Sequence, residues 1–393
     1  MSPATHRFDS ITETALVEQG SNKWTTYPGT IGMHIAEMDF GVADPVRKSL
    51  DEVDRRDLFG YAPEWLYDEV RRATSDFYAD LSGYRVPPER IDTLPDVLMG
   101  LNVAMDHFSA PGSKIVLLTP AYMPFFTAPT FAGREVIEVP MIKGESDWTV
   151  DYAGLDAAFK AGGGLLVFVN PHNPIGKVYS AKEIVRIGEV VEANGARVYA
   201  DEIHAPLVYS EHSHVPYTSV NEVNAGHAVT AIAATKAFNI PGLKCAQMLF
   251  SNEADLAVWK QKCLFTAHMA SNPGLFATAA AYTGSRDWLA EVRTYLEGNR
   301  DLVTELLPAL VPDAVFIPPQ GTYIGWLDLR ATCARLGIDP SALHTHILEK
   351  GKVSFTDGAL CGTGLAGHLR MNFATPRPIL REALERTAAA LSE

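Results

Sequence analysis

Five short runs of apolar residues, separated by helix-like segments, constrain the fold of this chain more than any other feature. The runs are KIVLLTP (114–120), LLVFVNP (165–171), ARVYADE (196–202), AVTAIAAT (228–235) and AQMLFS (246–251). Runs without polar–apolar alternation are typical of strands covered on both faces, as in parallel sheets. Residues 180–195 predict a helix between two of them, with a capping box formed by Ser180 and Glu183 and with Gly195 at its C-terminal end. Strand–helix–strand alternation predicts an α/β fold with a mostly parallel sheet.

The C-terminal part of the chain has a different pattern. Residues 286–307 predict a long helix, and GTYIGWLDLR (321–330) and GHLRMNFAT (367–375) predict strands. ILREALERTAAALSE (379–393) predicts a closing amphipathic helix. These elements predict a second, smaller α+β unit.

Charge and cysteine content restrict the class of protein. The formal net charge of −14 argues against nucleic acid or an anionic membrane as the main partner. The four cysteines have no paired spacing, which favours free thiols in a reducing cytoplasm. The polar N-terminal segment has no apolar signal core, and no apolar run is long enough to span a membrane. We expect a cytoplasmic protein with a small-molecule ligand.

Polar side chains follow several of the predicted strands. NPHNPIG (170–176), DEIH (201–204), Lys236 and PAYMPF (120–125) each come after a strand, and TLPD (93–96) precedes a helical pattern at 97–108. Ligands of open α/β sheets bind at the carboxyl ends of the strands. The sequence therefore predicts one site in which amide, carboxylate, amine and aromatic groups meet.

Lys236 is the most informative of these residues because lysine is rarely buried without a partner. It could be a surface lysine extending from a loop between two strands. Alternatively, it is a Schiff-base lysine, whose neutral amine is made available by desolvation. Such a site also needs a carboxylate for a ring nitrogen, a stacking aromatic, a phosphate site at a helix N-terminus and an arginine for the substrate. The candidates are Asp201, Tyr122, Val97 and Leu98 with Lys244, and Arg370.

The motifs NPHNPIG, YADEIH, TKAFNIPGLK and LRMNFATP resemble those of the pyridoxal-phosphate-dependent class I/II aminotransferase family, fold type I. KWTTYPGTIGMHIAEMDF (23–40), FGYA (59–62) and HVPYTSV (214–220) are similar to its cystathionine β-lyase (C–S lyase) branch. The resemblance implies a large cofactor-binding domain over 47–285 with helices on both faces of its sheet, and a small domain of 1–46 with 286–393. It also implies pyridoxal 5′-phosphate as cofactor, an amino-acid substrate and a homodimer with shared active sites.

The resemblance also implies a role for individual residues. Lys236 is matched to the lysine that bonds to the cofactor and moves the substrate proton, Asp201 to the carboxylate at the ring nitrogen, and Tyr122 to the stacking aromatic. Other implied cofactor contacts are Asn173, His204, Val97, Leu98, Thr235, Lys244 and, from a neighbouring subunit, Tyr61. The implied substrate contacts are Arg370 for the α-carboxylate, Asn173, Ala36 and His34.

Four positions depart from the family pattern. His34 stands where tryptophan is usual, Met123 where a second tyrosine often follows, Glu37 where aspartate is usual, and Ala233 where aminotransferases commonly have serine. We expect His34 and Met123 to face the substrate. These departures leave the identity of the substrate open more than that of the cofactor.

The reaction implied by the resemblance is β-elimination from an S-substituted cysteine, which yields a thiol, pyruvate and ammonia. The alternatives are amino transfer, or another reaction at the α-carbon such as decarboxylation in a biosynthetic pathway. A regulatory cofactor sensor fits poorly because the sequence has no DNA-binding module.

Two of these residues could instead have a purely structural role. Asp201 could instead cap a helix starting in DEIHAPL, and Arg370 could lie on an exposed edge strand.

No metal site is predicted. His344 and His346 lie two apart on a predicted helix and should point to different faces. His212 and His214 lie in a predicted loop without an accompanying carboxylate or cysteine at ligand spacing. The glycines at 162–164 precede their strand, so they do not form a dinucleotide-binding loop.

Overall fold

The computed structural model of the chain describes residues 6–392 and contains one large, mostly parallel sheet. The spatial order of its seven strands is β2 (Ile91–Leu94), β10 (Ala246–Phe250), β9 (Ala228–Ile232), β8 (Arg197–Asp201), β7 (Gly163–Val169), β3 (Lys114–Thr119) and β4 (Val136–Pro140). Strand β10 runs antiparallel to both of its neighbours, and the remaining pairs are parallel. The five predicted strands are confirmed, with no end shifted by more than three residues.

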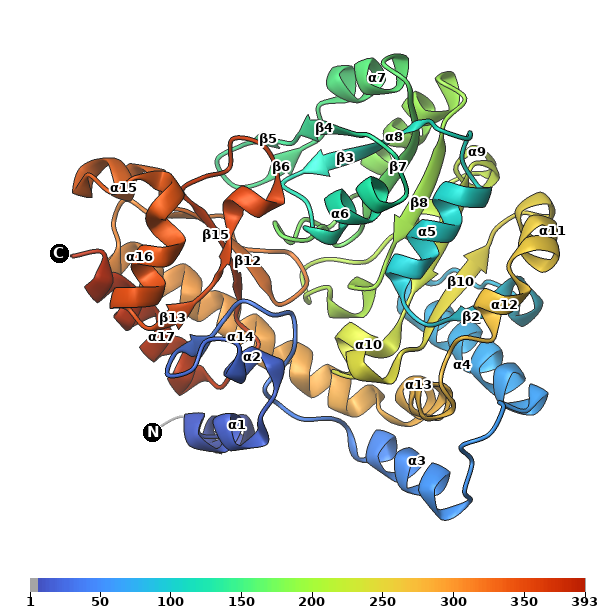
Figure 1. Cartoon of the computed structure of the whole chain (residues 1–393), viewed down its shortest axis with the longest axis horizontal. Coiled ribbons are helices and arrows are strands. Elements are labelled where there is room, and N and C mark those ends of the chain that lie inside the picture. Colours follow the sequence, from blue (N-terminus) through green and yellow to red (C-terminus); the bar gives the residue numbers. More distant parts are fainter. Residues whose placement is uncertain (1–5, 393) are drawn as a thin grey trace.

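Helices cover both faces of this sheet (Figure 1), as the continuous apolar runs predicted. One face packs against α5 (Val97–His107), α6 (Pro124–Phe131) and α11 (Glu253–Lys262). The other packs against α7 (Tyr152–Lys160) and α8 (Ala181–Ala193). The predicted capping box of α8 is present, but Asn194 is its C-cap, and Gly195 follows with a φ of 61°.

The second part of the fold is built on a four-stranded antiparallel sheet. Its strand order is β11 (Val315–Phe316), β12 (Ile324–Asp328), β15 (His368–Asn372) and β14 (Thr356–Asp357). Around it lie α14 (Arg286–Leu310), α15 (Arg330–Leu336), α16 (Leu343–Lys350) and α17 (Arg377–Ala390). The predicted strands and both predicted helices are confirmed, and α14 is three residues longer than expected. The division into domains of 47–285 and 1–46 with 286–393 stays a prediction.

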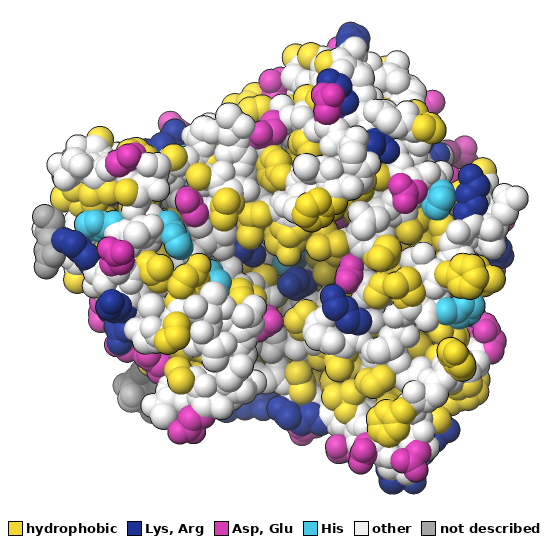
Figure 2. All heavy atoms as spheres, in the orientation of Figure 1, with side chains coloured by type: hydrophobic (Ala, Val, Ile, Leu, Met, Phe, Trp, Pro, Cys, Tyr) yellow, Lys and Arg dark blue, Asp and Glu magenta, His cyan; other side chains and the backbone are white. Residues whose placement is uncertain are grey.

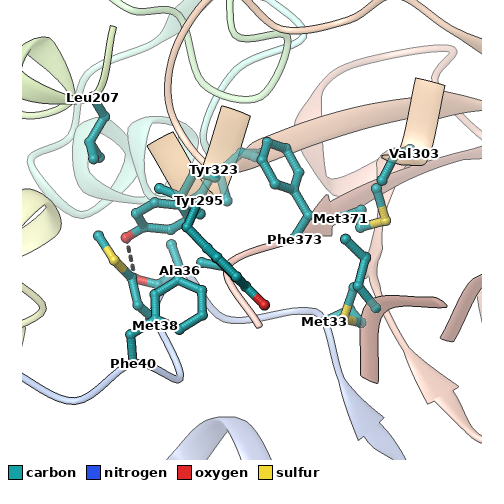
Figure 3. Packing of buried hydrophobic residues seen from close by; sticks show 14 of the residues in the cluster. Met33, Ala36, Met38, Phe40, Leu207, Tyr295, Val303, Tyr323, Met371 and Phe373 are labelled. Carbon is teal, nitrogen blue, oxygen red and sulfur yellow. Dashed lines mark hydrogen bonds between the residues drawn. The ribbon is translucent and has the colours of Figure 1, made fainter. Parts of the chain in front are cut away.

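The N-terminal segment joins this second part (Figure 1). It contains α1 (Glu13–Gln19), α2 (Asn22–Thr25) and β1 (Ile31–Gly32), which pairs in parallel with β13 (Val353–Ser354). Residues 33–40, called here the N-terminal strap, follow β1. Their side chains Met33, Ala36, Met38 and Phe40 enter the same apolar cluster as Tyr295, Tyr323 and Phe373 (Figure 3).

Two short strands and several further α-helices complete the described fold, apart from short 3₁₀ helices. They are β5 (Ile142–Lys143) with β6 (Trp148–Thr149), α3 (Asp44–Arg55), α4 (Glu64–Ser82), α9 (Glu222–Gly226), α10 (Ala234–Ala237), α12 (Leu264–Ala267) and α13 (Asn272–Gly284). Lys236 lies on the helical turn α10, between β9 and β10, and not in an open loop as predicted. Between residues 6 and 392, no helix has the length and apolar character needed to cross a bilayer.

Candidate active site

A pocket with about 780 Å³ of free space, part of it open to solvent, lies at the carboxyl ends of β3, β7, β8 and β9. Each of these strands delivers one predicted site residue to it: Tyr122, Asn173, Asp201 and Lys236. Figure 2 shows a hollow near the middle of the face of the molecule that it presents, with basic side chains inside the hollow and hydrophobic side chains around it. The other lining residues are Ala36, Asp96, Val97, Leu98, Phe125, Val169, Ile203, His204, Thr235, Pro241 and Lys244.

The amine of Lys236 points to the N-terminal strap. Its Nζ donates a hydrogen bond to the carbonyl of Ala36 at 3.0 Å, and it has no ion pair within residues 6–392. Burial, helped by the nearby charge of Arg370, lowers the pKa of Lys236 to about 8, against the opposing influence of Glu37 and Asp201. A fraction of this amine is therefore neutral near physiological pH and can act as a nucleophile or base.

Asp201 is the last residue of β8 and is buried. Burial raises the pKa of its carboxyl to about 7, although the backbone N–H of Ile203, at 3.0 Å, and the charge of Lys236 partly offset this. The short 3₁₀ helix Ala205–Leu207 begins after His204, so the alternative that Asp201 caps a helix in DEIHAPL is wrong. No basic side chain pairs with Asp201 in the described chain. Its carboxylate is therefore free to accept a proton or a hydrogen bond from a ligand.

His204 is buried beside Asp201 and lines the same pocket. Its Nδ1 lies 2.9 Å from the hydroxyl of Thr322. Burial, together with the positive charges of Lys236 and Arg370, lowers the pKa of His204 to about 3. The ring is therefore neutral and offers Nε2 to a ligand as a hydrogen-bond partner.

Arg370 lies on β15, an inner strand of its sheet, and is 2% exposed, so the alternative of an exposed edge-strand residue is wrong. Its Nε donates to Asn173 Oδ1 at 3.2 Å, and Nη1 donates to Thr356 Oγ1 and to the carbonyl of His34, both at 3.0 Å. These acceptors are all neutral, and burial lowers the pKa of the guanidinium. No carboxylate of residues 6–392 pairs with Arg370, so a buried positive charge is left for an anionic ligand.

The N-terminus of α5 forms an anion site at one end of the pocket. Asp96 caps the helix by accepting the N–H of Met99 at 2.9 Å, while the N–H groups of Val97 and Leu98 make no hydrogen bond in the described chain. Thr235 and Lys244 line the pocket at the same end. Lys244 pairs with Asp96 at 3.0 Å. Free N–H groups at a helix N-terminus, with a lysine beside them, can bind a phosphate group.

Three predicted residues are not part of the pocket lining: Arg370, described above, His34 and Tyr61. The ring of His34 packs edge-on against Tyr27, and its Nδ1 lies 3.0 Å from the hydroxyl of Ser354. Its carbonyl, not its ring, contacts Arg370. Tyr61 is fully exposed, near Phe59 and His268, and does not line the pocket of its own chain. The predicted roles of the His34 ring and of Tyr61 stay predictions.

The groups that hold the N-terminal strap were not predicted. Tyr323 donates its hydroxyl to the carbonyl of Ala36 at 3.0 Å (Figure 3), and Asn372 Nδ2 donates to the carbonyls of Ile35 and Glu37. Buried Lys23 and Asp39 form an ion pair of 2.7 Å. The motif KWTTYPGTIGMHIAEMDF contains this pair, but a lysine sixteen residues before an aspartate gives no sequence signal of contact.

The histidine pairs bind neighbouring protein groups. His344 and His346 each contact a backbone carbonyl, at 3.1 and 2.8 Å. His214 lies 2.8 Å from the carboxylate of Glu202, which is near it in space but not at ligand spacing in the sequence. Nowhere in residues 6–392 do three His, Cys, Asp or Glu side chains gather in a way that could hold a metal ion.

Comparisons with known proteins identify relatives over nearly the whole chain. Residues 28–386 match the family "Aminotransferase class I and II". A cystathionine β-lyase of Corynebacterium glutamicum is 36% identical, over 98% of this chain and 100% of that protein. A structure from Corynebacterium diphtheriae, provisionally assigned as a pyridoxal-phosphate-dependent β-cystathionase, superposes with a TM-score of 0.91 at 36% identity over 98% of both chains. The pyridoxal-phosphate-bound C–S lyase of Staphylococcus hominis superposes with a TM-score of 0.89 at 25% identity, over 100% of this chain and 99% of that one.

Proposed function

Because the chain belongs to the aminotransferase class I and II family, we propose that it is a pyridoxal-phosphate-dependent C–S β-lyase. The reaction cleaves an S-substituted cysteine, with one water, into a thiol, pyruvate and ammonium. The observation that carries the proposal is the pair of Lys236 and Arg370: Lys236 lines the pocket, Arg370 donates to the lining residue Asn173, and neither has an acidic partner within residues 6–392. One can attack a carbonyl and the other can bind a carboxylate, which suits an amino-acid substrate.

The residues present fit the cofactor. The neutral fraction of the Lys236 amine can bond to its aldehyde, and the free N–H groups of Val97 and Leu98 can bind its phosphate. Asp201 lies in the lining with a carboxyl that has no basic partner to displace. When bound, pyridoxal phosphate supplies an electron-withdrawing ring that stabilises negative charge at the substrate α-carbon.

The chain's own groups then have distinct tasks. Asp201 holds a proton at the ring nitrogen, because a carboxylate shielded from water favours a cationic hydrogen-bond partner. Arg370 orients the substrate by binding its α-carboxylate with two nitrogens. Lys236 removes the α-proton as a general base, for which a pKa of about 8 is well matched. Release of the thiolate from Cβ follows from the charge left at the α-carbon.

The test follows thiol and pyruvate released from an S-substituted cysteine, in parallel with amino transfer to an added keto acid. We expect thiol release without a keto acid in the native enzyme, and its loss in a Lys236→Ala variant. A Lys48→Ala variant, at an exposed position on α3, serves as the matched control. Turnover that depends on a keto acid, with no thiol released, would reject the lyase in favour of an aminotransferase.

We further propose a homodimer with shared active sites. Tyr61 and Phe59 are exposed by 104% and 67%, beside the similarly exposed Phe265 and Met269. The segment around residues 58–61 lies beside the segment that leads to Asn272, because Asn272 Nδ2 donates to the carbonyls of Leu58 and Gly60. An exposed apolar surface of this kind is typical of an interface, and a second copy of the chain would cover it.

Hybrid dimers test the sharing of sites. A Tyr61→Ala chain mixed with a Lys236→Ala chain should regain activity, because a hybrid dimer retains one intact site. Mixed dimers that form, as shown by native mass spectrometry, and stay inactive would exclude shared sites.

We propose that the enzyme acts in the cytoplasm. All four cysteines are buried and free, which suits a reducing compartment. Cell fractionation followed by the thiol-release assay would test this.

A further inference from the structure

Thr322 has a strained backbone in the interior of the fold. Its φ is 64°, and among the non-glycine residues with positive φ in the described chain it is the only one with a β-branched side chain. A β-branched residue rarely adopts this left-handed conformation, because its side chain is crowded by the backbone. Such strain persists only where the surrounding structure holds it, and it is concentrated at functional sites.

Hydrogen bonds to the loops of the large sheet hold the backbone of Thr322. Its N–H donates to the carbonyl of Leu207 at 2.9 Å, and its carbonyl accepts the hydroxyl of Tyr209 at 2.5 Å. Just before it, the N–H of Gly321 donates to the carbonyl of Gly176 at 3.2 Å. The turn that leads into β12 is therefore tied to the loops that follow β7 and β8.

The side chain of Thr322 is directed at His204. Its Oγ1 lies 2.9 Å from Nδ1 of the ring, and this nitrogen is the only hydrogen-bond partner of the hydroxyl within residues 6–392. Both side chains are buried, so the protein has to supply the acceptor for the hydroxyl proton. The ring is neutral, as its pKa of about 3 requires, and a neutral imidazole has one nitrogen that donates and one that accepts.

Of the two tautomers of His204, one leaves a buried polar group unpaired. If Nδ1 carried the ring proton, it would donate to Oγ1, and the hydroxyl proton of Thr322 would have no acceptor in the described chain. If Nδ1 carries no proton, the hydroxyl donates to it and both groups are satisfied. An unpaired buried donor is costly, so the second tautomer is favoured. The ring proton then lies on Nε2, which has no hydrogen bond between residues 6 and 392.

We infer that Thr322 is a positioning residue, whose hydroxyl orients the ring of His204 and keeps the ring proton on Nε2 for donation to an oxygen of the ligand. Thr322 acts through His204, because His204 lines the pocket and Thr322 does not. The identity of the ligand rests on the proposed function, under which the oxygen is the ring hydroxyl of pyridoxal phosphate. A donor at Nε2 stabilises this oxygen when it is ionised, whereas a bare nitrogen would repel it.

The first test determines which nitrogen of His204 carries the proton. NMR chemical shifts of isotope-labelled histidine distinguish the two tautomers in the full-length chain, and a His204→Gln variant assigns the signal. We expect an unprotonated Nδ1 and a protonated Nε2, both without and with pyridoxal phosphate. A protonated Nδ1 in the native chain would overturn the inference.

A pair of ligands tests whether the proton on Nε2 is used. Pyridoxal 5′-phosphate carries the ring hydroxyl, and 3-deoxypyridoxal 5′-phosphate lacks it. The measured quantity is the ratio of the dissociation constant of the deoxy compound to that of pyridoxal phosphate. Valine keeps the shape of threonine without the hydroxyl, so we expect Thr322→Val to lower this ratio roughly tenfold. Thr322→Ser retains a hydroxyl and should keep most of the ratio.

Two controls show whether Thr322 acts through His204. Thr332→Val changes a buried threonine on α15 whose hydroxyl has no hydrogen-bond partner in the part of the chain described, and it should leave the ratio at its native value. In a His204→Phe background, Thr322→Val should not lower the ratio further, because the group it acts on is absent. Equal losses of affinity for both ligands in Thr322→Val, or a further fall of the ratio in the His204→Phe background, would overturn the inference.

Failure of the proposed function would appear separately. A native chain that binds neither ligand would exclude the cofactor, and one that binds both but releases no thiol would exclude the reaction. The tautomer of His204 is a property of the chain itself, so its measurement decides the inference in either case.

Discussion

Replacing Lys23 with methionine should destabilise the protein by leaving a buried charge unpaired. The side chains of Lys23 and Asp39 are 0% and 4% exposed, and their charged atoms lie 2.7 Å apart. At an effective dielectric constant of about 20, this distance corresponds to an attraction of roughly 6 kcal/mol. Desolvation of both ions opposes it, but loss of one partner leaves the other's desolvation uncompensated. We therefore expect Lys23→Met to cost about 3–5 kcal/mol.

Thermal unfolding at a fixed cofactor concentration measures this cost. For a chain of 393 residues that unfolds as one unit, about 3–5 kcal/mol corresponds to a fall of about 4–6 °C in Tm. The double variant Lys23→Met/Asp39→Asn should recover part of the loss. Its amide oxygen can still accept the Trp24 indole N–H, which now donates to Asp39 at 2.9 Å, and no charge stays buried.

The control is Lys48→Met, at an exposed lysine of α3 without an ion pair in the described chain, which should change stability by less than about 0.5 kcal/mol. A Tm for Lys23→Met within 1 °C of the native value would refute the reasoning. So would a double variant less stable than the single one, since losses would then add instead of compensating. Because Asp39 belongs to the N-terminal strap, we also expect Lys23→Met to raise KM by weakening the position of Ala36.

Three further predictions concern the site and its support. In the chain without cofactor, the rate at which an amine reagent labels Lys236 should rise with pH, with a midpoint near pH 8. At pH 7 the neutral fraction of Lys236 should exceed that of a lysine with a pKa of 10.5 about 300-fold. Peptide mass spectrometry measures the labelling, and a labelling midpoint near pH 10.5 would contradict the prediction. Arg370→Lys should lower kcat/KM roughly 10–100-fold with cofactor binding retained, because an ammonium cannot bind a carboxylate with two nitrogens; an unchanged KM would argue against a carboxylate contact. Glu202→Ala should cost about 2–4 kcal/mol in urea unfolding, since it leaves the hydroxyl of Tyr78 and Nε2 of His214 without their buried acceptor, and Glu202→Gln should cost less.

The sequence predicted the central strands well because a strand that is buried on both faces has a continuous apolar run, whichever way the strand runs in the sheet. Strands β7, β8 and β9 consist mainly of apolar residues, and their ends were found within a few residues. The same pattern says nothing about orientation, so the antiparallel direction of β10 could not be predicted. The edge strands β2 and β4 were also missed: β2 is short and contains Asp92 and Thr93, and β4 is partly exposed and interrupted by Glu138.

The site was predictable where side chains carry the chemistry and at the start of α5, where Val97 and Leu98 expose their N–H groups, but not where single backbone carbonyls make the contact. Asn173, Asp201 and Lys236 were found because parallel strands bring the residues that follow them to one edge of the sheet. The carbonyl of Ala36, which binds the amine of Lys236, has no signature in the residue type. Asn372 was missed for a related reason: it holds backbone carbonyls, and its distance from the strap in sequence exceeds 330 residues.

The long distance in sequence between the N-terminal strap and β15 also sets the order in which the site can form during synthesis. The strap is made first, all seven strands of the large sheet lie between 91 and 250, and β15 comes only at 368–372. At about 5–20 residues per second, the ribosome needs roughly 15–70 s to pass from the strap to β15. For that interval Met33, Met38 and Phe40 lack those members of their apolar cluster that come later in the chain, such as Tyr295, Tyr323 and Phe373. The nascent chain therefore carries an unfinished pocket with an apolar, undocked cover, and a chain interrupted before His368 would keep every strand of the large sheet yet be unable to close its site.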